Sequence, residues 1–179
     1  MIAKKIPIRA YCFDFDDTLV KTDAKIYIYK NGKKIKSLTS KEINNYVLQP
    51  GETIDLRDFS DPRLIMRAKK YKMWPVLKSI DMNKKMGKFT GDIYILTARS
   101  PVVKNAIYVF LKDNGIDIPL ENIITVNNES EYESDVSVRK EKVLKDLKNK
   151  YVEVFFYDDN EENIRIASKI GGIKTILID

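Results

Sequence analysis

The sequence predicts an α/β protein, a Rossmann-like three-layer sandwich with a mainly parallel five-stranded sheet. Two observations carry this prediction. Five short apolar segments fit buried strands, and the intervals between most of them carry helical patterns, as in parallel sheets flanked by helices. Carboxylates directly follow two of these segments, where open parallel sheets bind their ligands. The 179 residues are enough for one domain with a sizeable core.

Each element follows from a local pattern. Pro75 suits the first turn of a helix, Ser100 precedes a proline at another helix start, and Gly87 and Gly115 suit helix ends. The polar, acidic stretch 127–135 predicts a loop. The expected strands cover residues 6–14, 92–98, 122–126, 151–159 and 172–178, and the expected helices cover residues 75–87, 100–114, 138–149 and 160–170.

Residues 19–72 interrupt this alternation inside one expected domain that spans residues 1–179. Alternating sequence on both sides of Asn31-Gly32 is typical of a β-hairpin with a two-residue turn. We call residues 19–72 the insertion, and we expect it to form a hairpin flap and at most a small cap.

The remainder of the insertion gives weaker signals. Thr39 and Glu42 form a capping box, which predicts a short helix that runs to about Leu48. Residues 51–72 match neither period well, and we expect them to be irregular.

Composition excludes several kinds of catalysis. The chain has no histidine, so Ser-His-Asp triads, Cys-His pairs and His-ligated zinc are excluded. An enzyme of this composition must rely on carboxylate, lysine or tyrosine groups, or on a hard metal ion such as magnesium. The single cysteine, Cys12, lies in an apolar run and suits a small core residue in a reducing compartment.

The chain also indicates where the protein acts. It has no apolar run long enough for a membrane span and no signal-peptide core, which predicts a cytoplasmic protein (in the host cytoplasm if it is viral). The net charge of +6 fits an anionic partner or, more simply, a lysine-rich coding bias. We expect a monomer or weak homodimer that does not bind membranes.

Carboxylates and a hydroxyl group are expected to meet at one edge of the sheet. Asp14 and Asp16 follow the first strand, Thr97 ends the second, and Asp158 and Asp159 end the fourth. Clustered carboxylates repel one another unless a cation lies among them. Oxygen ligands in a protein without histidine favour Mg²⁺.

Four motifs in this order resemble the haloacid dehalogenase superfamily of phosphotransferases, and the match covers nearly the whole chain. The first is Asp-x-Asp-x-Thr, here "DFDDT" from Asp14 to Thr18. The second is the hydroxyl residue in "YILTAR", the third a lysine in "VRKEKVL", and the fourth the acidic pair in "FFYDDNEEN".

The resemblance implies roles for the first motif and for the residues around Thr97. Asp14 would be the nucleophile that forms an aspartyl phosphate, and Asp16 would be the general acid and base. Thr97 would bind a phosphoryl oxygen, with Ala98 and Arg99 beside the substrate. For Arg99, a surface ion pair is an equally good interpretation.

The resemblance also implies a lysine and a metal site. Lys140 would neutralise charge in the transition state, although Lys142 also fits the motif. Asn163 would orient the shell of metal ligands. The implied ligands of Mg²⁺ are Asp14, Asp16, Asp158 and Asp159.

The second carboxylate narrows the reaction that the resemblance implies. ATPases of the superfamily have no acidic residue at the position of Asp16, and its dehalogenases need no metal, so Asp16 indicates a phosphatase. The expected function is Mg²⁺-dependent hydrolysis of a small phosphorylated metabolite or nucleotide. The alternatives are a phosphatase acting on a nucleic-acid 3′ end or a phosphoprotein, and a non-catalytic binding module.

The light cap resembles the small hydrolases of this superfamily from bacteriophages and large viruses. More distantly, the chain resembles the phosphatase half of phage polynucleotide kinase–phosphatases. It departs from them in having no kinase half and no phosphate-binding glycine loop, and "LTAR" stands where we associate those enzymes with Ser-Gly-Arg.

Overall fold

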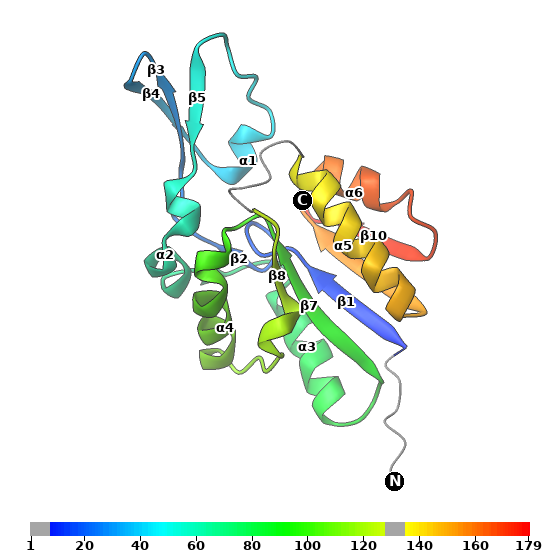
Figure 1. The fold of residues 1–179 in the computed structure, drawn as a ribbon. Helices are drawn as coiled ribbons and strands as arrows, with labels where there is room; N and C mark the ends of the chain where they lie inside the picture. Colours follow the sequence, from blue (N-terminus) through cyan, green and yellow to red (C-terminus); the bar gives the residue numbers. More distant parts are fainter. Residues whose placement is uncertain (1–7, 128–134) are drawn as a thin grey trace.

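The computed structural model describes residues 8–127 and 135–179, and Figure 1 shows their arrangement. The predicted five-stranded parallel sheet is confirmed, with the strand order β10-β9-β1-β7-β8. Its strands are β1 (Arg9–Phe13), β7 (Gly91–Thr97), β8 (Ile123–Thr125), β9 (Glu153–Asp158) and β10 (Ile173–Leu177). The expected strand start at residues 6–7 and most of the expected loop at 127–135 lie outside the described residues.

Helices cover both faces of this sheet, which makes the predicted three layers (Figure 1). Because side chains alternate along a strand, Phe13 of β1 faces one apolar cluster and Cys12 faces the other. The first cluster includes residues of α3 (Trp74–Lys85) and α4 (Lys104–Asp113), and the second includes residues of α5 (Val136–Lys150) and α6 (Glu161–Ala167). None of the described helices has the length and apolar character needed to cross a membrane.

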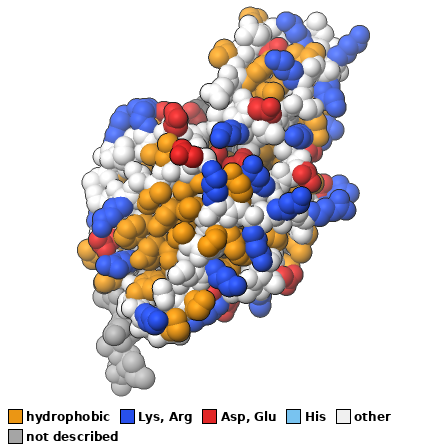
Figure 2. Space-filling model, turned by 180° about the vertical axis from the view of Figure 1, so that it is seen from behind, with side chains coloured by type: hydrophobic (Ala, Val, Ile, Leu, Met, Phe, Trp, Pro, Cys, Tyr) orange, Lys and Arg blue, Asp and Glu red, His pale blue; other side chains and the backbone are white. Residues whose placement is uncertain are grey.

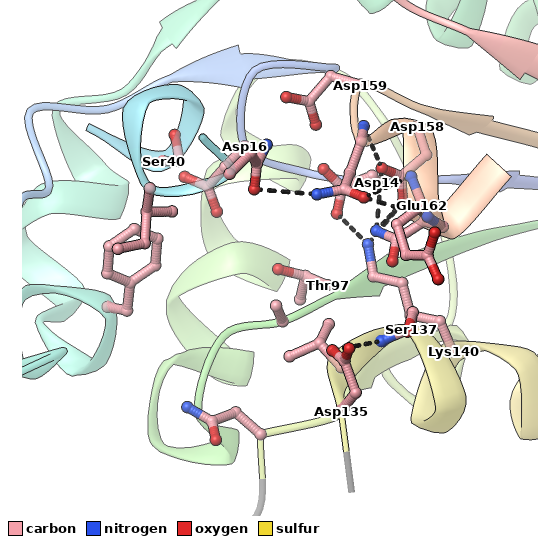
Figure 3. A pocket seen from close by; sticks show the side chains of 18 of the residues that line it. Asp14, Asp16, Ser40, Thr97, Asp135, Ser137, Lys140, Asp158, Asp159 and Glu162 are labelled. Carbon is pink, nitrogen blue, oxygen red and sulfur yellow. Dashed lines mark hydrogen bonds and ion pairs between the residues drawn. The ribbon is translucent and has the colours of Figure 1, made fainter. Parts of the chain in front are cut away.

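The helix α5 begins two residues before the expected start at Val138. The side chain of Asp135 accepts a hydrogen bond from the backbone N–H of Ser137, and this N-cap adds the earlier residues to the helix. Lys140 consequently lies just over one turn inside α5, with its side chain directed to the sheet edge (Figure 3).

The insertion contains more regular structure than we expected. The predicted hairpin is present as β3 (Ile26–Lys30) and β4 (Lys33–Leu38), and β5 (Glu52–Asp55) pairs antiparallel with the other edge of β3. We call this three-stranded unit the insertion sheet. The expectation that residues 51–72 are irregular is therefore wrong. The four residues of β5 have only a modest local preference for a strand, and they adopt one because they pair with β3.

Short elements complete the insertion. The capping box of Thr39 and Glu42 is confirmed, but α1 (Ser40–Ile43) ends well before Leu48, because Asn44 and Asn45 follow as a turn. The remaining elements of the insertion are β2 (Val20–Lys21), η1 (Arg57–Ser60), α2 (Pro62–Met66) and β6 (Lys69–Lys70), and those of the core are η2 (Pro101–Val103) and η3 (Leu120–Asn122).

The start of β7 requires a glycine because the strand approaches β1 closely there. A Cβ atom on Gly91 would lie 2.8 Å from the backbone oxygen of Arg9 and 2.7 Å from the ring of Phe89. At Gly171 a Cβ atom would meet no atom within 4 Å, and the backbone is not in the left-handed region.

These two glycines give a matched test of the sheet packing. We expect Gly91→Ala to lower the free energy of unfolding by about 1–3 kcal/mol, because the backbone of β1 must move. Gly171→Ala should change it by less than about 0.5 kcal/mol. Denaturant unfolding of both variants measures the difference, and equal stabilities would contradict this account of the β1–β7 contact.

Candidate active site

A buried lysine links the carboxyl ends of β1 and β9 at the edge of the sheet. Lys140 Nζ lies 2.7 Å from Asp14 Oδ1 and 2.7 Å from Asp158 Oδ2. All three side chains are buried. Burial acts to lower the pKa of Lys140, but the two carboxylates outweigh burial and raise it, so the ammonium stays charged.

Asp14 has one oxygen held and one free. It follows β1, and its backbone N–H donates to the carbonyl of Tyr157 on β9. Burial raises the pKa of Asp14 well above its usual range, with the charge of Lys140 opposing this rise and the charges of Asp158 and Asp159 adding to it. Asp14 Oδ2 has no hydrogen-bond donor among the residues that the structure describes, whereas Oδ1 accepts from Lys140.

The acidic pair at the end of β9, Asp158 and Asp159, consists of one carboxylate whose acceptor positions are filled and one without a hydrogen-bond partner in the described residues. Asp158 accepts hydrogen bonds from Lys140, from the backbone N–H of Asn160 at 2.8 Å, and from Asn163 Nδ2 at 3.0 and 3.1 Å. Asp159 makes no side-chain hydrogen bond to the described part of the chain. Burial raises the pKa of Asp159 to about 7, with repulsion from Asp158 and Asp17 as the next causes.

Three of these carboxylates form a group that fits a metal ion. Asp14, Asp158 and Asp159 each offer an oxygen, and the three oxygens lie within 4.8 Å of one another. An all-carboxylate donor set of this kind suits a hard divalent cation, which would also relieve the mutual repulsion. Asp16 is not a member of this group, which differs from the ligand set expected from the sequence.

Asp16 instead forms a buried ion pair with Arg99. The guanidinium donates to both carboxylate oxygens at 2.8 Å, and Thr22 Oγ1 donates to Oδ1 at 3.2 Å. Arg99 is fully buried and packs over the ring of Phe59, with 4.9 Å from Arg99 Cζ to the ring centroid. The ion pair considered for Arg99 is thus present but buried, and Arg99 lies behind Asp16 rather than at the pocket wall where substrate contact was expected.

A pocket of about 560 Å³ lies over these groups. Its lining includes Thr97, the last residue of β7, and Ala98, together with Asp14, Asp16 and Lys140. Thr97 Oγ1 accepts a hydrogen bond from the backbone N–H of Arg99, which leaves its proton free to be donated into the pocket. Figure 3 shows Asp14, Thr97 and Lys140 around this space, and Lys142 is exposed to solvent.

The insertion contributes contacts that the motifs did not predict. Ser40 of α1 donates a hydrogen bond to Asp17, which has a positive φ of 57° in the loop after β1. Asn160 Nδ2 donates to Asn44 Oδ1 at 2.9 Å, which ties α1 to the start of α6. The insertion also contributes apolar side chains to the lining of the pocket, namely Ile26, Ile43, Ile54, Leu56 and Phe59.

The comparisons with known proteins bear on the fold. Two similar solved structures are described as the Pnkp1/Rnl/Hen1 RNA repair complex and as the Pnkp1/Rnl/Hen1 complex. The first has a TM-score of 0.58 and 16% identity and covers 98% of this chain and 43% of that chain. The second has a TM-score of 0.56 and 18% identity and covers 98% and 47%.

This chain therefore spans less than half of the chains that it matches, and at these identities the likeness shows the fold. No protein-family model matches the sequence, and a search of curated proteins finds no match.

The two carboxylates of the acidic pair should respond differently to substitution. Asp158→Asn places an amide against the donors Lys140 and Asn163, and we expect a loss of about 3–5 kcal/mol in unfolding free energy. Folding raises the pKa of Asp159, so its charge opposes folding at pH 8. In chelator at pH 8, Asp159→Asn should therefore raise the Tm.

The same melts test the metal site. Mg²⁺ should raise the Tm of the unmodified protein, because a ligand that binds only the folded state stabilises it. Asp159→Asn should show a much smaller rise. Equal Mg²⁺-induced shifts in both proteins would contradict the assignment of Asp159 as a ligand.

Proposed function

We propose that the protein is a Mg²⁺-dependent phosphomonoester hydrolase that acts through an aspartyl phosphate on Asp14. One observation carries the proposal: Asp14 enters the pocket with Oδ2 free, Oδ1 fixed by a buried lysine, and the carboxylates of Asp158 and Asp159 beside it. An anionic nucleophile beside a phosphate needs such positive charge and orientation.

The first half of the reaction forms a bond from Asp14 Oδ2 to phosphorus and breaks the bond from phosphorus to the ester oxygen. Thr97 Oγ1 donates a hydrogen bond to a phosphoryl oxygen, and the ammonium of Lys140 stabilises the added negative charge. A Mg²⁺ ion held by Asp14 and Asp159, with Asp158 close by, would supply further positive charge against the phosphate.

Asp16 transfers the proton in both halves of the reaction. Its two oxygens offer about four acceptor positions, of which Arg99 uses two and Thr22 one, so that one position on Oδ2 stays open. In the first half Asp16 gives a proton to the departing ester oxygen. In the second half it takes a proton from the water that attacks phosphorus, and the P–O bond to Asp14 breaks to release inorganic phosphate.

The reaction itself is compatible with several substrates. A small phosphorylated metabolite, a nucleotide, a phosphoprotein or a nucleic-acid 3′ end all present a monoester to the same groups. The likeness in fold to chains from RNA repair complexes adds support to nucleic-acid end processing. A non-catalytic module would retain the pocket but show no turnover.

A leaving-group series tests the proposed chemistry. Activity on p-nitrophenyl phosphate and on a simple alkyl phosphate should require Mg²⁺ and disappear in chelator. Asp14→Asn should abolish both activities, because no nucleophile remains.

Asp16→Asn should slow hydrolysis of the alkyl ester more than that of the aryl ester, since the aryl oxygen departs without a proton. Equal slowing of both esters would remove Asp16 as the general acid, and activity in chelator would contradict the metal requirement.

The two lysines of α5 provide a second test of the site. Lys140→Ala should lower kcat by about 100-fold or more, the scale of losing one preorganised donor. Lys142→Ala should change kcat little, because a residue two positions further along a helix points about 200° around the helix axis from Lys140. Thermal melts should accompany the kinetics, since Lys140→Ala also leaves two buried carboxylates without their cation. Full activity of folded Lys140→Ala would contradict the role of this lysine.

A further inference from the structure

The net positive charge of the chain comes from the insertion. Residues 19–72 carry 13 Lys and Arg against six Asp and Glu, a net charge of +7. The rest of the chain carries 19 against 20, a net charge of −1. A coding bias toward lysine would act on the whole chain, so it does not account for this separation.

Four of these 13 cations lie on the insertion sheet, which projects from the core (Figure 1), and Figure 2 shows Lys and Arg side chains over this lobe. Four lysines of β3, its turn and β4 are exposed and form no ion pair with any described residue: Lys30, Lys33, Lys34 and Lys36. Lysines on an edge strand also oppose sheet-to-sheet association. That role needs only a few charges on β4, not a net charge of +7 over the insertion.

Two of these lysines lie near aromatic rings. Lys34 Nζ lies 5.2 Å from the ring centroid of Tyr27, and Lys36 Nζ lies 4.6 Å from that of Tyr46. Tyr29 stands opposite Lys34 in the strand register, on the same face as Tyr27. Basic groups interleaved with aromatic faces are typical of surfaces that bind single-stranded nucleic acid.

A second hollow lies beside the pocket of the active site. It has a volume of about 670 Å³ and is lined by Tyr29, Thr53 and Arg57. It shares Ile54, Leu56 and Asn127 with the pocket over Asp14. The acidic residue of this hollow, Asp55, is neutralised by Arg57, whose Nε donates to it at 2.7 Å.

We propose that the insertion sheet binds single-stranded nucleic acid and leads its terminal phosphate into the active site. Lysines of β3 and β4 contact the phosphodiester backbone, and Tyr29 stacks on a base in the second hollow. The proposal rests on the function proposed above for its final step, because it assigns the substrate class of that same site. Binding by the insertion sheet does not depend on turnover.

Binding is measured first, by fluorescence anisotropy with labelled single-stranded DNA and RNA of about 12 nucleotides, a length in the range that one such surface covers. The protein should bind with a steep salt dependence. Lys33→Gln/Lys34→Gln/Lys36→Gln should weaken binding by about 10-fold or more and reduce the slope of log K against log salt by up to about 2. The matched control, Lys78→Gln/Lys142→Gln/Lys150→Gln, removes the same charge from α3 and α5 and should bind as the unmodified protein does.

Stacking is tested separately from charge. Tyr29→Ala should weaken binding by about five-fold or more, whereas Tyr29→Phe keeps the ring and should bind normally. An abasic oligonucleotide of equal length carries the same phosphates without bases and should bind more weakly. Equal binding of the abasic strand, or equal losses in the two lysine triple variants, would overturn the proposal.

Kinetics separate this proposal from the proposed function. The Lys33→Gln/Lys34→Gln/Lys36→Gln variant should have a kcat/KM for a 3′-phosphorylated oligonucleotide that is lower by about 10-fold or more, in line with its weaker binding. Its kcat/KM for p-nitrophenyl phosphate should not change. Hydrolysis of p-nitrophenyl phosphate with no specific oligonucleotide binding would overturn the insertion-sheet proposal and leave the phosphatase standing. Specific oligonucleotide binding with no hydrolysis of either substrate would overturn the proposed phosphatase activity and leave the binding role of the insertion sheet standing.

Discussion

The ion pairs of Lys140 are the interaction on which the site depends. The ammonium of Lys140 on α5 is buried between two carboxylates, Asp14 directly after β1 and Asp158 at the end of β9. Removing these charges from water is costly, and only short contacts with good geometry offset that cost. The arrangement therefore fixes the rotation of α5 about its axis, because no other rotation gives the buried ammonium two carboxylates. It also fixes which oxygen of Asp14 faces the pocket.

The acidic pair shows how a charged site and a stable fold coexist. Asp158 is fully buried, and Lys140, Asn160 and Asn163 compensate its charge without any other ligand. Asp159 has no such support, and the rise of its pKa to about 7 records that its charge is unfavourable where it lies. A cation at this position would remove that penalty. Stability is thus maintained by one carboxylate of the pair, while the affinity for a cation is concentrated in the other.

The sequence predicted those features that follow from local patterns. Apolar runs that end in Asp14, Thr97 and Asp158 predicted both the strands and the edge where their ends meet, because parallel strands bring their carboxyl ends together. It did not predict β5, whose four residues are a strand only because β3 lies beside them. Nor did it predict the pairing of Arg99 with Asp16, since 83 residues separate them and an arginine two positions after a strand end has many solvent-exposed alternatives. Contacts between the insertion and the core, such as Ser40 with Asp17, leave no periodic signal at all.

The separation of charge between core and insertion has a physical reason if the substrate is an anion. The site presents carboxylates to an incoming phosphate, so the near field at Asp14 and Asp159 repels it until it contacts Lys140 and a bound cation. The core, with a net charge of −1, offers no attraction at longer range. At physiological salt such fields extend only about 8 Å, so attraction must come from groups that the ligand meets first. The insertion meets that need, because it carries the exposed lysines of β3 and β4 and also contributes residues to the hollow beside the pocket. Chemistry and attraction are thus assigned to different segments, and a change in the insertion can alter what is bound without disturbing the buried pairs that set the reactive groups.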